Sequence, residues 1–187
     1  MTIPLILLLI LFGLIMVVGL WLMGSYNGLV TLRQAVRNAW AQIDVQLKRR
    51  HDLIPNLVNT VKGYAAHEKE TFERVINARA RATSASLPAE VIKAEGELSS
   101  ALSRLLAVSE SYPELKANQN FLSLQEELTS TENRVAYARQ FYNDNVTRLN
   151  TRIQTFPTVV IAGMFGFKEE PFFEAPVEEK QAPKVEF

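Results

Sequence analysis

The chain begins with an apolar run that is longer than any other in the sequence. The 21 residues from Ile3 to Met23 include no charged side chain. As a helix that rises about 1.5 Å per residue, this run can cross the roughly 30 Å hydrocarbon core of a bilayer. A cleaved signal peptide is the alternative, but no lysine or arginine precedes the run, and Met23-Gly24-Ser25 is a poor cleavage site. The pattern therefore predicts a retained transmembrane anchor, residues 1–25.

Apolar residues then recur at steps of three and four, the pattern of helices with one buried face. The first two such faces are Leu29, Leu32, Val36, Trp40, Ile43 and Leu47, then Leu53, Leu57, Val61, Tyr64, Phe72 and Ile76. Between them, Asp52 can cap a new helix that tolerates Pro55 in its first turn, which predicts a turn at residues 48–52. One helix kinked at Pro55 is the alternative. We expect the break, because a continuous helix from Asn27 to about Ala82 would be roughly 80 Å long with no return partner.

Two further amphipathic helices follow. A turn at Ser84–Pro88 precedes a third apolar face, and Tyr112-Pro113 marks a stop and restart. The third face comprises Val91, Leu98, Leu102, Leu105 and Val108. In the fourth helix, large hydrophobic residues fall at every seventh position: Phe121, Leu128, Val135, Tyr142, Leu149 and Phe156. Such a sustained repeat indicates knobs-into-holes packing against neighbouring helices, and Pro157 ends the helix.

Four amphipathic helices with short connections predict an all-α fold. We expect a single N-terminal transmembrane helix followed by an antiparallel, up-down four-helix bundle with long helices over residues 26–157. In this topology the 48–52 turn lies far from the bilayer, whereas the end of the fourth helix returns to it. Residues 158–174 then form an aromatic, membrane-proximal tail. Residues 175–187, rich in proline and charge, are expected to be disordered.

Charge and cysteine content narrow the classes of function. The 20 Lys and Arg residues balance 20 Asp and Glu residues, so no net field favours nucleic acid as a partner. The absence of cysteine excludes disulfides, thiolate metal sites and a cysteine nucleophile. Lys and Arg are absent before the anchor but follow it at Arg33 and Arg37, which favours a cytoplasmic bundle over a periplasmic one.

The two histidines offer little catalytic chemistry. His67-Glu68 begins like a zinc-protease motif, but HExxH needs a second histidine where the chain has Thr71. We interpret His67 as a capping residue or the partner of a helix neighbour, and His51 as a solvated turn residue. The basic cluster Lys48-Arg49-Arg50 suits the C-terminal end of a helix, where cations complement the dipole. The sequence therefore predicts no catalytic, metal-binding or cofactor-binding residues.

Two groups of residues are candidates for interaction sites. Tyr142 lies on the heptad seam of the fourth helix and Asn145 on or beside the alternate seam, where buried polar groups can fix register and partner choice; a solvated flank with only Tyr142 buried is the alternative. The second group is the phenylalanines of the tail: Phe165, Phe167, Phe172 and Phe173. Their density, next to glycine and proline, is typical of a segment that docks on a partner or membrane, and the alternative is that they fold back onto the bundle.

Three blocks of the sequence resemble the LemA family of bacterial membrane-anchored proteins. The blocks are YNGLVTLRQAVRNAWAQIDVQLKRRHDLIPNLVNTVKGYAAHE, ENRVAYARQFYNDNVTRLNTRIQTFP and FGFKEEPFF. The resemblance implies a helical bundle on a membrane anchor and brings no established enzymatic activity. We therefore expect a non-enzymatic scaffold or adaptor in the bacterial inner (plasma) membrane that binds membrane proteins or copies of itself. The alternative is an atypical metal-dependent hydrolase that uses His67 and Glu68.

Overall fold

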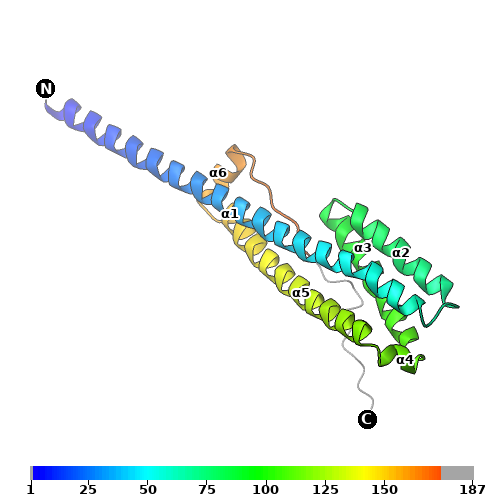
Figure 1. The fold of residues 1–187 in the computed structure, drawn as a ribbon. Helices are drawn as coiled ribbons and strands as arrows, with labels where there is room; N and C mark the ends of the chain where they lie inside the picture. The colour runs from blue at the N-terminus through cyan, green and yellow to red at the C-terminus, as the bar shows by residue number, and fades with distance from the viewer. Residues whose placement is uncertain (1, 174–187) are drawn as a thin grey trace, which may run out of the picture. The chain divides into compact units, whose positions relative to one another are not determined.

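The computed structural model describes residues 2–173, and every regular element in this range is a helix (Figure 1). The helices are α1 (Thr2–Lys62), α2 (Lys69–Ser84), α3 (Pro88–Ser109), α4 (Pro113–Lys116), α5 (Gln119–Gln154) and α6 (Thr158–Met164). The prediction of an all-α protein with a long apolar N-terminal helix is confirmed. The antiparallel four-helix arrangement stays a prediction, and the expected disordered segment 175–187 lies outside the described residues.

The chain divides into two compact units, which we describe one at a time. The anchor unit comprises the described part of Met1–Ala39 together with Phe141–Pro171. The core unit comprises Trp40–Gln140 together with Phe172 and Phe173. Helices α1 and α5 each continue from one unit into the other.

The expected turn at residues 48–52 is wrong, because α1 continues through it to Lys62 with Pro55 inside the helix. Proline has no N–H, so it cannot donate to the carbonyl four residues earlier, which belongs to His51. Arg79 of α2 donates from Nε to this carbonyl oxygen at 2.7 Å and replaces the missing helical hydrogen bond. Asp52 is therefore an exposed residue within α1 rather than a cap, and the chain turns only after Lys62.

The core unit is built on one hydrophobic cluster to which α1, α2, α3, α4 and α5 all contribute. Helices α2 and α3 pack side by side (Figure 1). The expected apolar face of α3 is confirmed, since Val91, Leu98, Leu102 and Leu105 are buried and Val108 is partly buried. From α1 the cluster takes Ile54, which directly precedes Pro55, and Leu57, Val58 and Val61, which follow it.

The heptad of the fourth predicted helix, which is α5, is confirmed for five of its six positions. Phe121, Leu128, Val135, Tyr142 and Leu149 are all buried. Phe156 is 79% exposed, because α5 ends at Gln154 and Phe156 lies in the short link to α6. The seam therefore ends at Leu149 and does not extend to the expected sixth position.

The first part of α1 presents an apolar surface on every side. The side chains of residues 3–24 are all exposed. Among the described residues, α1 is the one helix long and apolar enough to cross a membrane. Water disfavours so large a contiguous apolar surface, so length, composition and exposure agree with the predicted anchor at Ile3 to Met23.

Candidate functional site

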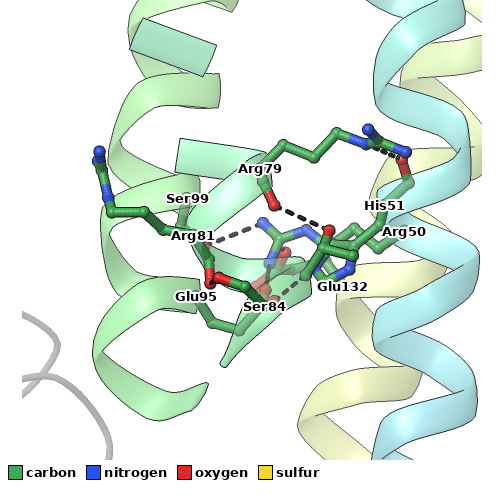
Figure 2. Close-up of polar contacts among 9 residues, drawn as sticks. Arg50, His51, Arg79, Arg81, Ser84, Glu95, Ser99 and Glu132 are labelled. Carbon is green, nitrogen blue, oxygen red and sulfur yellow. Dashed lines mark hydrogen bonds and ion pairs between the residues drawn. The ribbon is translucent and has the colours of Figure 1, made fainter. Parts of the chain in front are cut away.

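A buried histidine–carboxylate pair lies in the core unit, between α1 and α3 (Figure 2). Glu95 of α3 is fully buried, and its Oε1 lies 2.6 Å from Nε2 of His51. This distance is that of a hydrogen bond between the imidazole ring and the carboxyl group. The other carboxylate oxygen of Glu95, Oε2, accepts from Nη1 of Arg50 at 3.2 Å.

Arg50 extends this pair into a network. Its Nη2 atom donates to Oγ of Ser99 at 2.9 Å and lies 2.7 Å from Oε2 of Glu132. The Arg50 side chain is only 4% exposed and thus meets one buried and one half-exposed carboxylate. Burying a charge is costly unless it is paired and hydrogen-bonded, and here each charged group has such a partner. The network links α1, α3 and α5 within the core unit.

Two expectations about this part of the sequence are wrong. His51 is not a solvated turn residue but a buried member of α1. Arg50 does not serve a helix C-terminus, because α1 continues to Lys62. Only Lys48 and Arg49 remain on the surface, where Arg49 pairs with Glu127 at 2.9 Å. Such exposed pairs contribute little to stability.

The network lacks the arrangement of a hydrolytic triad. Ser99 Oγ is held by Arg50, and His51 faces Glu95, so histidine and hydroxyl are not paired as base and nucleophile. An open cavity of about 1020 Å³ between α2 and α3 is lined in part by Ser99, but neither His51 nor Glu95 reaches it. The contacts of the network join α1 to α3 and α5.

His67 and Glu68 lie in the link between α1 and α2. His67 is exposed, and the backbone of Glu68 caps α2 by accepting from the N–H of Phe72 at 3.2 Å. Within residues 2–173, no three His, Asp or Glu side chains are grouped so that they could hold a metal ion. The pair thus gains no additional ligand from the fold.

Polar side chains of α5 hold the chain segment that follows α6 in the anchor unit. Tyr142 is buried and donates from its hydroxyl to the carbonyl of Pro171 at 2.9 Å. Asn150 makes two bonds to the backbone of Glu170: Nδ2 donates to its carbonyl at 2.9 Å, and Oδ1 accepts from its N–H at 3.0 Å. Burial and, secondarily, the charge of Glu170 raise the pKa of Tyr142 above its ordinary value.

Asn145, the second polar residue expected at the seam, is also buried. Its Nδ2 donates to the carbonyl of Phe141, one turn earlier in α5, at 2.7 Å. Both expected polar residues therefore face inward, whereas their role in fixing register or partner choice stays a prediction. Asn150 is a third buried polar residue of α5, and only the fold reveals its bond to a segment 20 residues later.

The four phenylalanines of the tail separate into two buried and two exposed side chains. Phe167 is buried in the anchor unit, where its ring centroid lies 5.8 Å from that of Tyr26 and 4.9 Å from the guanidinium of Arg33. Phe165 is 56% exposed, although its ring centroid lies 4.8 Å from that of Tyr26.

The other two phenylalanines lie in the core unit. Phe173 is buried, with its ring centroid 6.0 Å from that of Trp40 and 4.6 Å from the guanidinium of Arg139. Phe172, its neighbour, is 48% exposed. Folding back thus accounts for Phe167 and Phe173, and docking stays a prediction that now concerns Phe165 and Phe172.

Within residues 2–173, every regular element is a helix and the first part of α1 is exposed and apolar, which together define a class: a membrane-associated helical protein. A profile of the LemA family matches residues 39–187, so the chain belongs to the LemA family.

The chain is similar to two magnetosome proteins and to a protein LemA of another bacterium. The chain is 25% identical over 179 residues to magnetosome protein MamQ 1 of Paramagnetospirillum magneticum. The alignment covers 82% of this chain and 66% of the relative. It is 24% identical over 178 residues to magnetosome protein MamQ of Magnetospirillum gryphiswaldense, covering 81% and 65%. It is 25% identical over 153 residues to protein LemA of Metamycoplasma hominis, covering 81% and 70%. The chain thus spans slightly less than two thirds of the length of the MamQ relatives.

Proposed function

We propose that this protein is a non-enzymatic scaffold of the bacterial plasma membrane. Residues 3–23 of α1 cross the bilayer, and the helical part over residues 26–157 forms an antiparallel four-helix bundle. The bundle binds membrane proteins or further copies of the chain. No covalent chemistry is assigned to it.

The observation that carries the proposal is the continuity of α1 from Thr2 to Lys62. One helix holds the exposed apolar segment and, further along, Ile54, Leu57 and Val61 of the hydrophobic core. A flexible tether would suffice to keep an enzyme near a membrane. Here the apolar segment and the core residues instead belong to one helix with no intervening linker, which supports a protein that acts next to its neighbours in that membrane.

Phe172 is the side chain we expect at the contact with a partner. It is half exposed on a segment whose next residue, Phe173, is buried, so its position is fixed without being covered. A preorganised aromatic side chain loses little conformational freedom on binding, and aromatic residues are enriched where proteins associate.

Photocrosslinking in native membranes tests the scaffold. A photoreactive phenylalanine analogue at Phe172 should yield crosslinked species larger than the monomer. The same analogue at Leu87, which is 60% exposed in the α2–α3 link, is the matched control and should yield far fewer. Recovery of only the monomer from Phe172, together with only the monomer after gentle lysine crosslinking, would contradict the proposal.

The side of the membrane is a separate part of the proposal: the Lys and Arg distribution supports a cytoplasmic bundle. The chain has no cysteine, so Ser86→Cys introduces a single label site in the exposed α2–α3 link. An impermeant thiol reagent should label this variant only after lysis. Labelling of intact spheroplasts would place the bundle on the periplasmic side instead.

A further inference from the structure

Helix α6 and its two flanks expose an apolar surface in the anchor unit. Phe156, Val159, Val160, Met164 and Phe165 are all exposed, Met164 by 71% and Val160 by 55%. The opposite face of α6 is buried through Thr158, Ile161 and Ala162. The helix is therefore packed on one face and leaves an apolar face uncovered by any described residue.

No charged residue interrupts this surface, since residues 153–167 contain none. The charged residues stand at the two ends of the stretch: the exposed Arg152 precedes it, and the exposed Lys168 follows it, with Glu169 and Glu170 directly after. A solvated surface helix usually carries charge on its outer face. An uncharged, apolar outer face is instead typical of helices that lie in the boundary layer of a membrane.

The structure also places this surface next to the end of the apolar segment. Phe165, directly after α6, lies with its ring centroid 4.8 Å from that of Tyr26, and Tyr26 follows the predicted anchor by three residues. Tyrosine is enriched at the level of the lipid headgroups. Figure 1 shows α6, in orange, beside the part of α1 that belongs to the same unit.

We propose that α6, with Phe156 and Phe165, inserts into the interfacial layer of the bilayer that α1 crosses, as a second, monotopic membrane contact. The proposal rests on the proposed function in one respect, namely that residues 3–23 of α1 span the membrane. Lipid is the occupant because the face is apolar, lacks polar groups that could select a protein, and adjoins the side chain expected at the headgroups.

Spin labels on the full-length chain in vesicles of phosphatidylcholine and phosphatidylglycerol test this contact. Single cysteines replace Val160 and Met164 on the exposed face of α6, with Leu14→Cys as the reference within the anchor and Ser86→Cys as the aqueous control. Collision with oxygen, which concentrates in lipid, is compared with collision with a water-soluble nickel complex. The labels at 160 and 164 should favour oxygen several-fold more than the label at 86 and less than the label at 14.

Three other outcomes would each overturn part of the proposal. If position 14 reports lipid while positions 160 and 164 match position 86, the interfacial contact is overturned and the anchor stands. If position 14 reports water, the anchor itself is wrong and the proposed function fails. Shielding of positions 160 and 164 from both reagents that rises with the protein-to-lipid ratio would show a protein contact between copies and would also overturn the lipid assignment.

A second variant guards against a local effect of the label. Val160→Glu combined with Met164→Glu should return a label at Val159, also exposed on α6, to water-like accessibility, because two carboxylates oppose burial among lipids. Circular dichroism that matches the parent chain confirms that the helices persist. A label at Val159 that keeps its preference for oxygen in this background would overturn the proposal.

Discussion

The two units of the molecule hold distant parts of the chain together by different interactions. In the core unit, Arg50, His51 and Glu95 form a buried network that contains the ion pair of Arg50 and Glu95. In the anchor unit, Tyr142 and Asn150 hold residues 170 and 171 by hydrogen bonds to backbone atoms. Buried charges are very costly when one partner is lost, whereas each neutral hydrogen bond contributes only about 0.5–1.5 kcal/mol.

The comparison indicates which contacts are tolerant of change. A network in which each charge depends on the others responds to a single substitution as a whole. A segment held by separate neutral bonds loses them one at a time. We therefore expect large and coupled effects of mutation in the core unit and small, independent effects in the anchor unit.

The largest effect is expected for Glu95→Ala, which leaves Arg50 and His51 buried without their common acceptor. The free energy of unfolding should fall by about 3–5 kcal/mol. The matched control is Glu97→Ala on the same helix, because the bond of Glu97 to Arg81 is exposed and is worth about 1 kcal/mol or less. Thermal unfolding of the full chain in detergent, followed by circular dichroism, measures both. Equal melting temperatures for the two variants would show that the network is not a source of stability.

Phe173→Ala should have the next largest effect, about 3 kcal/mol, as for a buried phenylalanine that leaves a cavity. Phe172→Ala should change the stability by no more than about 0.5 kcal/mol, because its ring is half exposed. The pair separates structural from docking aromatics, since only Phe172→Ala should weaken crosslinking to a partner at unchanged stability. A large loss of stability in Phe172→Ala would assign this residue to the fold instead.

Arg79→Ala should cost about 1–3 kcal/mol, because the carbonyl of His51 then lacks a donor. In the Pro55→Ala background residue 55 has an N–H that can donate to the same carbonyl, so Arg79→Ala should cost measurably less. A double-mutant cycle on thermal unfolding gives the coupling, expected to be about 1 kcal/mol. If the effects of the two substitutions on stability are additive, Arg79 stabilises the protein through a contact other than the carbonyl of His51.

Among the buried contacts, the smallest effect is expected in the anchor unit, for Tyr142→Phe, which removes one hydrogen bond worth about 1 kcal/mol. This substitution should also change how the stability of the fold depends on pH. Because the pKa of Tyr142 is raised in the folded state, the unfolded state loses the phenolic proton first as the pH rises above about 10, and stability falls there. Tyr142→Phe should lessen this fall between pH 9 and 11, measured by unfolding at each pH. An unchanged slope would show that Tyr142 titrates alike in both states.

The sequence predicted those parts of the fold that depend on local pattern. The apolar face of α3 and the five seam positions of α5 from Phe121 to Leu149 follow from periodicity, which the structure confirms. The long apolar start of α1 follows from composition, and its role as an anchor stays a prediction. Phe156 satisfies the same period but falls beyond the end of α5, so it is exposed. The heptad repeat predicts which residues lie on the buried face only within the bounds of the helix.

The continuity of α1 could not be predicted, because the group that compensates Pro55 is Arg79, a residue of another helix. The charge network was missed for a similar reason, since His51 and Glu95 are 44 residues apart. One local signal was present. Glu95 falls between Val91 and Leu98 on the apolar face of α3, at steps of four and three, where a carboxylate is out of place unless a cation meets it.

The bond from Arg79 to the carbonyl of His51 also constrains the order of events while the protein is being made. Synthesis proceeds from the amino terminus, so the helical turn that contains Pro55 leaves the ribosome before Arg79 does. Until then the carbonyl of His51 lacks the donor that it has in the folded chain. We therefore expect the end of α1 to reach its final form together with α2.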